Sequence, residues 1–318
     1  MDILAAVLSI AAVRGSVAAT LTAGAGWGLR MAEVPGAAFH AVTSGSAHLE
    51  VAGRPPIRLM PGDVVLLPTG VEHSLLGSPD ARAEPFDHVR AEAALAEGGR
   101  LVIGEPPVTT QIICASYDQD PAARWSPFAA LPPVVYLPAL SAPPGLRTSL
   151  SLISDELAGA GPGLRPVLDH VVNIVLIQLL RAWVEATSHT AAAPSWLRGL
   201  ADPTTRSALG ELHRDPAFPW TIESLARQVG VSRATLARRF GSEVGTSPGS
   251  YLNGWRMELA ARSLRTGTDT VGAVARSVGY GSEYAFNRAF ARHHGVPPGR
   301  YRSAAGSVPR ARGAVPGH

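Results

Sequence analysis

Two kinds of apolar pattern divide the 318-residue chain. In residues 1–140, short apolar runs alternate with turns that are rich in glycine, proline and aspartate. Examples of these runs are AAFHAVTSG, AHLEVAG, IRLMPGDVVLLP, RLVIGE and TTQIICASYD. Many short strands at close spacing predict an all-β sandwich or barrel. After a proline-rich joint at 137–145, apolar residues recur at helical intervals instead.

The longest apolar stretch, residues 167–186, predicts a helix that is apolar around much of its circumference. It contains six polar or charged residues, which disfavour a bilayer span: Asp169, His170, Asn173, Gln178, Arg181 and Glu185. Such a helix either packs on two sides within one chain or forms a homodimer seam. A second joint, SHTAAAPS at 188–195, predicts a linker to the last third of the chain.

The last third contains one pattern twice. ARQVGVSRATLARRF at 226–240 recurs as ARSVGYGSEYAFNRAF at 275–290, with an offset of 49 residues that becomes 50 after the turn. Each copy predicts a helix, a glycine turn at Gly230 or Gly279, and a second helix capped by Ser232 or Ser282. This order is that of a helix-turn-helix, whose second helix enters the major groove of DNA.

The helical period also predicts which side chains of each second helix point outward. In the first copy Leu236 and Phe240 face inward, and in the second Phe286 and Phe290 do. The outward residues are Arg233, Ala234, Ala237 and Arg238 in the first copy, and Glu283, Tyr284, Asn287 and Arg288 in the second. The apolar helix at 247–265 joins the copies, and we expect it to hold the two second helices about 34 Å apart, on successive groove faces.

Residues 202–302 resemble the DNA-binding domain of the AraC/XylS family of transcription regulators. The resemblance rests on WTIESLARQVGVSRATLARRF, on YLNGWRMELAARSLR and on the ending GVPPGRYR. It implies that the outward residues of both second helices other than Arg233 read bases, and that the protein forms a homodimer.

By this resemblance, Arg238 and Arg288 each bind guanine and Asn287 binds adenine. Glu283 either accepts a hydrogen bond from cytosine or is simply solvated. The small Ala234 and Ala237 read little beyond a thymine methyl group, while Arg233, Arg239 and Arg256 contact phosphate or form local ion pairs.

PGDVVLLPTGVEHSL at 61–75 has the spacing of the second conserved motif of cupin barrels, and residues 1–140 resemble the cupin-type sensor domain of an AraC-like subgroup. Metal-binding cupins need a His-x-His pair, but His40 is followed by Ala41 and Val42. We therefore expect no metal and no cofactor, and we take His40 and His73 as candidate ligand-binding residues. His48, Glu50 and Glu72 are near them in sequence. Cys114, the single cysteine, is interpreted as a buried apolar residue rather than a redox sensor.

Charge supports the assignment to DNA. Residues 200–318 contain 16 arginines against 8 acidic residues, whereas residues 1–199 contain 12 against 17. A basic last third is typical of a module that binds a polyanion. No signal peptide is evident, and a single cysteine fits a reducing compartment, so we expect a cytoplasmic protein.

The sequence therefore predicts a multidomain chain: an all-β cupin-like sensor barrel at 1–140, a helical linker and dimerisation region at 141–195, an all-α tandem helix-turn-helix domain at 196–303 and a disordered tail at 304–318. It predicts a transcription regulator without catalytic residues. The expected partners are promoter DNA, a small-molecule effector and a second copy of the chain; RNA polymerase is a further candidate, and a membrane is not. The alternative is a metal-dependent cupin enzyme, an isomerase or dioxygenase, fused to a DNA-binding module.

Overall fold

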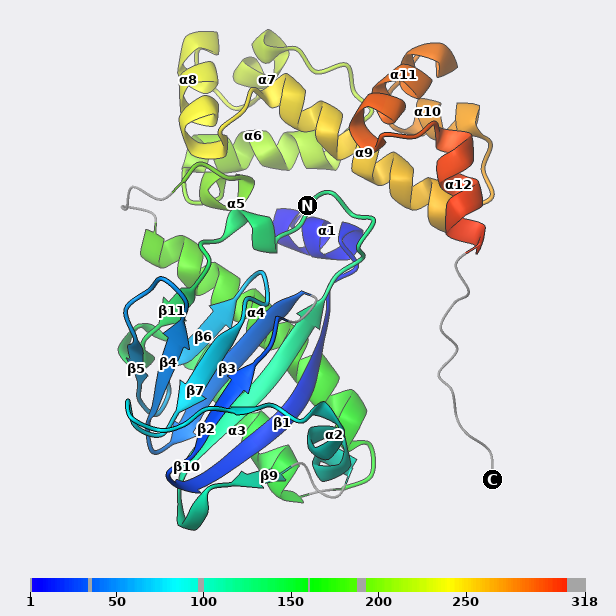
Figure 1. Ribbon diagram of the computed structural model, residues 1–318. Coiled ribbons are helices and arrows are strands. Elements are labelled where there is room, and N and C mark those ends of the chain that lie inside the picture. Colours follow the sequence, from blue (N-terminus) through cyan, green and yellow to red (C-terminus); the bar gives the residue numbers. More distant parts are fainter. Residues whose placement is uncertain (1, 34–35, 97–99, 160, 188–192, 308–318) are drawn as a thin grey trace. The chain divides into compact units, whose positions relative to one another are not determined.

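The computed structural model describes residues 2–33, 36–96, 100–159, 161–187 and 193–307 (Figure 1). Most of the linker expected at 188–195 lies outside the described residues, as does the expected tail from residue 308 on. The chain divides into two compact units. The β-rich unit comprises Ala11–Ala122 and Ser126–Ala191, and the helical unit comprises Met1–Ile10, Ala123–Trp125 and Ala192–His318.

The β-rich unit contains two sheets, in agreement with the all-β prediction. The first has the strand order β11-β6-β3-β10-β1-β9 and the second the order β5-β4-β7-β2-β8. The strands are β1 (Arg14–Ala25), β2 (Gly28–Met31), β3 (Ala37–Ser44), β4 (Ala47–Val51), β5 (Ile57–Leu59), β6 (Val64–Leu67), β7 (His73–Leu76), β8 (Glu84–Pro85), β9 (Arg100–Ile103), β10 (Glu105–Asp118) and β11 (Val135–Leu137). The pairing leaves edge strands on both sheets, so the described strands form two separate sheets rather than the closed barrel that the sequence suggested.

One apolar core lies between the sheets. It includes Leu21 and Ile112 from the first sheet and Leu49 and Leu75 from the second. Successive side chains of a strand point to opposite faces, and β4 follows this rule with Ala47, Leu49 and Val51 buried. The apolar residues whose alternation predicted the strands are therefore the residues that fill the core.

Two long helices, α3 (Pro144–Gly159) and α4 (Leu164–Thr187), pack against each other, and α4 also packs on β1. Tyr117 donates a hydrogen bond to the Val172 carbonyl at 2.9 Å, and Asn173 accepts one from the Gly15 amide at 3.0 Å. Residues 164–186 are long and apolar enough to cross a membrane by length and composition, and half of the most apolar stretch is buried within the structure. A helix that packs on a sheet, as α4 does, can have the same length and apolar composition, so these two properties do not by themselves indicate a membrane span. The remaining helices of the unit are α2 (His88–Ala96), η1 (Phe128–Ala130) and η2 (Ala139–Ser141).

The helical unit is built around α9 (Pro248–Thr266). The other helices are α1 (Ile3–Ile10), α5 (Trp196–Gly199), α6 (Pro203–Arg214), α7 (Ile222–Gln228), α8 (Arg233–Val244), α10 (Val271–Ser277), α11 (Glu283–His294) and α12 (Pro298–Ser307). The first half of α9 supplies Tyr251 and Leu252 to a core with α6, α7 and α8. Its second half supplies Met257 and Leu264 to a core with α10 and α11. One helix therefore joins two small cores, as the sequence predicted.

The first ten residues belong to the helical unit, although they precede the strands in the sequence. Ile3 packs in the core of α6 and α8, and Val7 and Ile10 pack against Trp255 of α9. Arg262 donates a hydrogen bond to the Ser9 hydroxyl at 2.9 Å. The sequence analysis did not predict this helix, although Asp2 caps it by accepting a hydrogen bond from the Ala5 amide at 3.1 Å.

Candidate functional sites

The first helix-turn-helix is formed by α7 and α8. Thr221 caps α7, and its hydroxyl accepts from the Ser224 amide, while the Ser224 hydroxyl accepts from the Thr221 amide. Gly230 adopts φ +73°, a left-handed conformation that few other residues tolerate. Ser232 then caps α8 by accepting from the Thr235 amide at 3.1 Å. The structure confirms the predicted turn at Gly230 and the predicted Ser232 cap.

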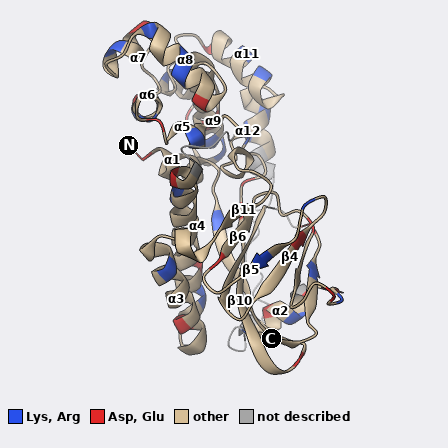
Figure 2. Ribbon diagram, turned by 90° about the vertical axis from the view of Figure 1, so that its left-hand side faces the viewer, with Lys and Arg blue, Asp and Glu red and all other residues tan. Residues whose placement is uncertain are grey.

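The outward face of α8 has the residues that the period predicted. Arg233, Ala234, Ala237 and Arg238 are exposed, and Leu236 and Phe240 are buried. Arg233 forms an exposed ion pair with Glu223 at 3.1 Å, so part of its charge is compensated within α7. Figure 2 shows arginines on α8 and α11. Because neither alanine carries a charge, the charge of this face comes from its two arginines.

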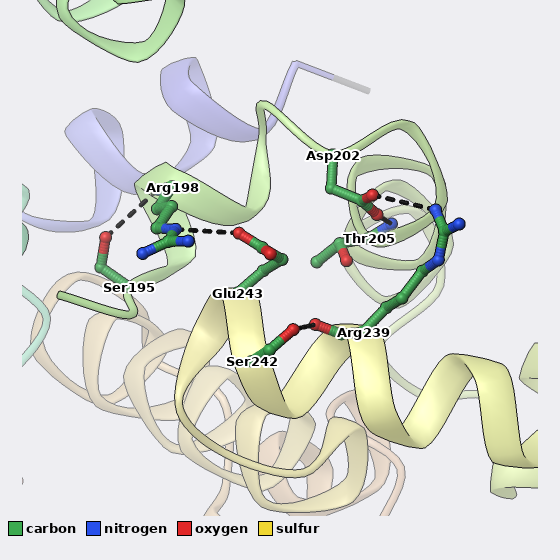
Figure 3. Close-up of polar contacts among 7 residues, drawn as sticks. All are labelled: Ser195, Arg198, Asp202, Thr205, Arg239, Ser242 and Glu243. Atoms are coloured by element: carbon green, nitrogen blue, oxygen red, sulfur yellow. Dashed lines mark hydrogen bonds and ion pairs between the residues drawn. The ribbon is translucent and has the colours of Figure 1, made fainter. Parts of the chain in front are cut away.

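Arg239 serves a different purpose from its neighbour Arg238. Its guanidinium donates to Asp202 Oδ2 at 3.1 Å (Figure 3). It also donates to the Thr204 hydroxyl at 3.3 Å. Asp202 is also the N-cap of α6, where it accepts from the Thr205 amide at 2.7 Å. Of the two roles expected for Arg239, phosphate contact or local ion pair, the structure contains the ion pair.

A second ion pair anchors the end of α8. The Arg198 Nε donates to Glu243 Oε2 at 2.9 Å, and the Ser195 hydroxyl caps α5 by accepting from the Arg198 amide (Figure 3). Both Arg198 and Glu243 are only about a fifth exposed, at 21% and 23% of their side chains. The inner side of α8 is thus fixed to α5 and α6, which leaves its outward face unobstructed within the helical unit.

The second helix-turn-helix is formed by α10 and α11. Gly279 adopts φ +87°, and an added Cβ there would lie 2.5 Å from the Ala217 carbonyl oxygen, so glycine is required both by conformation and by space. Ser282 caps α11, as predicted. The pattern of the first copy therefore repeats in three dimensions as well as in sequence.

The outward face of α11 is chemically different from that of α8. Glu283, Tyr284 and Arg288 are exposed, Tyr284 by 71%, and Asn287 is half-buried. The Arg288 guanidinium lies 5.8 Å from the centre of the Tyr284 ring, a cation–π arrangement that orients both side chains toward solvent.

Arg256 of α9 does not belong to either outward face. Its guanidinium donates to the backbone carbonyls of Pro216 at 2.6 Å and Phe218 at 2.9 Å, and burial lowers its pKa. It therefore fixes the loop before α7 to α9. Of the two roles expected for Arg256, a local ion pair is not formed among the described residues, and the phosphate contact stays a prediction.

The β-rich unit encloses a cavity of about 200 Å³. Most of its lining is apolar, and the remaining lining side chains are those of His40, His73, Cys114, Ser116 and Asp118. The apolar lining residues are Ala18, Leu21, Leu29, Met31, Ala38, Leu75, Phe86 and Ala115. The two histidines that the sequence selected thus lie side by side at one cavity wall, together with a cysteine that it did not connect to them.

His40, His73 and Cys114 form a continuous chain of contacts. Strand pairing places Cys114 of β10 opposite His40 of β3, and the Cys114 Sγ lies 3.2 Å from His40 Nδ1. The other ring nitrogen, His40 Nε2, lies 2.8 Å from His73 Nε2. His73 Nδ1 lies 2.7 Å from the Val71 carbonyl oxygen. The register that joins β3 to β10 cannot be read from the sequence, which explains why the cysteine was missed.

The protons along this chain are ordered. Burial, and secondarily His73, lowers the pKa of His40 well below its usual value, burial lowers that of His73, and burial raises that of Cys114 to about 12. Both imidazoles are therefore neutral and the thiol is protonated at pH 7. Because the Val71 carbonyl only accepts, His73 donates to it through Nδ1. His40 then donates to His73, and the Cys114 thiol donates to His40.

This geometry bears on metal binding. His40 faces Cys114 with one nitrogen and His73 with the other, so the three side chains do not direct their ligand atoms to one point. Glu72 is exposed, and His48 and Glu50 lie on the face of β4 opposite the core. The structure therefore does not bring the three neighbouring residues noted in the sequence to the His40–His73 pair.

Comparisons with known proteins agree with both units. A cupin family model matches residues 2–185, and a helix-turn-helix domain model matches residues 225–304. A putative AraC-like transcription regulator of Streptomyces lividans is 39% identical over 310 residues, 95% of this chain and 98% of the relative. The HTH-type transcriptional regulator AlkR of Acinetobacter baylyi is 30% identical, over 87% of this chain and 90% of that one.

Among solved structures, the DNA-binding domain of AdpA, a global transcriptional factor crystallised with a target DNA, is 33% identical. It matches 32% of this chain and 92% of its own, with a TM-score of 0.31.

Proposed function

The chain belongs to the family of AraC-like transcription regulators, and on that premise we propose that α8 and α11 read two short blocks of one promoter site. The relatives are regulators, which supports a regulator over the metal-dependent cupin enzyme. The observation that carries the proposal is that α8 exposes its four outward side chains and α11 exposes three of its four, with Asn287 half-buried, and that one continuous helix joins the two copies. A rigid connection between the two gives the DNA site a fixed spacing.

Individual roles follow from exposure and chemistry. Arg238 and Arg288 are exposed and are long enough to bind guanine through O6 and N7, and Asn287 suits adenine. Ala234 and Ala237 contact thymine methyl groups. Tyr284 contributes its shape to the contact with the groove, and the Glu283 carboxylate accepts a hydrogen bond from cytosine. Arg233 contacts phosphate. Arg239 acts indirectly, by holding α8 on α6.

Selection from a randomised DNA pool tests this function. Full-length protein is incubated with the pool at about 150 mM salt, because binding driven only by phosphate contacts weakens steeply with salt. We expect enrichment of sites with two short blocks about one helical turn apart. Retention without enrichment would show that the arginines bind DNA without reading it.

We also propose that the cavity of the β-rich unit holds the effector, and that this effector is small and largely apolar. The ordered protons leave His40, His73 and the Cys114 thiol hydrogen-bonded to one another. Polar groups that remain for a ligand are Ser116 and Asp118 at the lining. A molecule that fills about 200 Å³ therefore gains mainly from apolar contact, with His40 and His73 as part of the wall that it touches.

Indole, which is small and apolar and has a single donor, is a suitable probe of this cavity. We expect it to raise the melting temperature of the full-length protein and to lose that effect in Ala38→Leu, which fills the cavity. Ala52→Leu, in an exposed turn, is the matched control. Equal stabilisation of both variants would place the binding elsewhere.

In His73→Ala we expect DNA binding to persist. Loss of DNA binding in proportion to a bound metal would instead support the alternative of a metal-dependent cupin enzyme.

Finally, we propose that the regulator acts in the cytoplasm as a homodimer through α3 and α4. Leu152 of α3 and Val167 and Ile174 of α4 are 42%, 37% and 48% exposed, so both helices present apolar side chains to solvent. The double variant Leu152→Glu and Ile174→Glu should shift the mass measured by light scattering from dimer to monomer. A monomeric wild type at micromolar concentration would remove this part of the proposal.

RNA polymerase stays a candidate partner, and co-purification of the polymerase with this protein on promoter DNA tests it.

A further inference from the structure

Three side chains with metal-ligand atoms converge at the C-terminal end of α11. Glu258 comes from α9, and His293 and His294 come from the last turn of α11. Their ligand atoms all lie within 4.8 Å of one another. His293 Nε2 lies 2.9 Å from Glu258 Oε1, and His294 Nε2 lies 3.9 Å from the same oxygen.

The carboxylate of this cluster is buried. The Glu258 side chain is 2% exposed, so its charge needs compensation inside the protein. Its second oxygen, Oε2, accepts a hydrogen bond from the Arg124 amide at 3.3 Å, which fixes the orientation of the carboxylate. Oε1 is left facing both histidines. Metal ligands are commonly oriented by such outer hydrogen bonds.

The histidines are suited to binding a cation. The His294 side chain is 2% exposed, and a neutral imidazole has a lone pair on one ring nitrogen. The His294 Nε2 lies 3.3 Å from the Met257 carbonyl oxygen, which only accepts, so in this contact Nε2 carries the ring proton. To bind a metal through Nε2, the ring gives up this hydrogen bond and carries its proton on Nδ1. The His293 side chain is 26% exposed, which gives an ion and a water ligand a route to the cluster. The positive charge of Arg124 near His294 opposes a cation and limits the affinity.

Two imidazoles and one carboxylate form a donor set found in zinc sites. Zinc binds nitrogen and carboxylate oxygen at about 2.0–2.2 Å in tetrahedral geometry, which separates the ligand atoms by roughly 3.3 Å. The 2.9 Å pair must therefore open slightly and the 3.9 Å pair must close slightly.

We propose that Glu258, His293 and His294 bind one divalent first-row transition ion, with Zn²⁺ preferred over Mg²⁺. The ion fastens the end of α11 to α9, and water occupies the remaining position. Because α11 carries the second outward face, the ion stiffens the second helix-turn-helix and not the first. This inference concerns the helical unit alone and does not depend on what occupies the cavity of the β-rich unit.

Isothermal titration of the metal-free, full-length protein with Zn²⁺ tests the site. We expect one equivalent to bind and Mg²⁺ to give no signal. Co²⁺ in its place should produce the intense visible bands of a tetrahedral ion. His293→Gln keeps a donor for Glu258 but removes a ligand, and should weaken Zn²⁺ binding by more than about 100-fold, beyond the typical effect of losing an outer partner.

Two further variants separate this site from adventitious binding. Glu258→Gln should lose Zn²⁺ in the same way as His293→Gln. His170→Gln is the matched control, because His170 is an exposed histidine on α4 outside the cluster. Zn²⁺ binding that is unchanged in His293→Gln, or that disappears in His73→Gln instead, would overturn the proposal, and so would the absence of binding in the wild type.

Discussion

The two helix-turn-helix copies share a backbone plan and differ in how it is fixed and what it displays. Both begin their second helix at a serine cap after a left-handed glycine, and both bury two large side chains one turn apart. The first copy displays two arginines and two alanines, and ion pairs to Asp202 and Arg198 fix it. The second displays a tyrosine, an asparagine, a glutamate and an arginine.

The positions that repeat are those that folding requires, and the positions that differ are those that we propose to read DNA. Glycine, serine and the buried aromatic positions are repeated because caps, turn and core set them. The outward positions are under no such constraint, so each copy can read a different block of DNA. The following four experiments test this separation between folding and reading, beginning with the largest expected effect.

Removing a core ring should affect folding in both copies, and more in the second. Phe240 and Phe290 occupy equivalent positions and are fully buried. Phe240 has a ring contact with Tyr251, whereas Phe290 has contacts with Phe286, His294 and Tyr301. We expect each Phe→Ala change to reduce the free energy of unfolding by about 3–5 kcal/mol, with Phe290→Ala at the upper end. Urea unfolding measures both, and exposed Tyr284→Ala is the control. Equal losses would show that the extra ring contacts contribute little.

Removing an outward arginine should affect reading and leave folding unchanged. Arg288→Ala and Arg238→Ala should each weaken binding to the selected DNA site by about 1–3 kcal/mol and relax base preference in one block only. Binding to a series of single-base substitutions measures this, with exposed Arg54→Ala of the β-rich unit as a control for net charge. If preference is unchanged across the series, these arginines contact phosphate and the comparison of reading faces fails.

Acid should weaken the first copy through a buried histidine. His213 lies in its core, 2.8 Å from the Tyr251 hydroxyl and stacked on Trp255, and burial lowers its pKa to about 3. Since the folded pKa is below the unfolded value of about 6.5, the unfolded chain binds the proton more readily. Stability is complete above pH 6.5 and is lost as the pH falls toward 3, by about 1 kcal/mol at pH 6.

The variant His213→Gln isolates this contribution. Glutamine can still hydrogen-bond to Tyr251 but does not titrate, so the slope of unfolding free energy against pH between 5 and 6.5 should fall by about one proton. Other buried histidines, including His40, keep their own contribution in both proteins. An unchanged slope would mean that His213 is protonated in the folded state.

Sequence periodicity predicted the helical unit well because local signals set it. Thr221, Ser232 and Ser282 cap helices, Gly230 and Gly279 permit left-handed turns, and every cap acts within three residues of itself. For the β-rich unit, the sequence predicted the strands and the family but not the arrangement of the strands in two separate sheets. Whether strands close into a barrel depends on pairing between distant segments, and alternation is the same in a sandwich and a barrel.

The same reason explains which site residues were found. His40 and His73 were selected by motif spacing, but their link to Cys114 depends on the register of β3 with β10, 74 positions apart in the chain. Glu258 and His293 meet because two helices cross, and their 35-residue separation carries no sequence signal. For Arg238 and Arg239, in contrast, the helical period alone indicates which side chain faces outward. This pair provides the prediction with the smallest expected effect.

Arg238 and Arg239 are neighbours with the same side chain, but Arg238 is exposed and Arg239 is paired with Asp202. Arg239→Ala removes the ion pair to Asp202 and the hydrogen bond to Thr204, and should lower the free energy of unfolding by about 0.2–1 kcal/mol, because the pair is partly exposed to solvent. Base preference should stay that of the wild type. Arg238→Ala should leave the free energy of unfolding within about 0.5 kcal/mol of the wild type and change base preference. Urea unfolding and DNA selection on both variants measure the two effects separately. If Arg239→Ala also alters base preference, the ion pair to Asp202 opens on DNA, and the inner side of α8 takes part in reading as well as in folding.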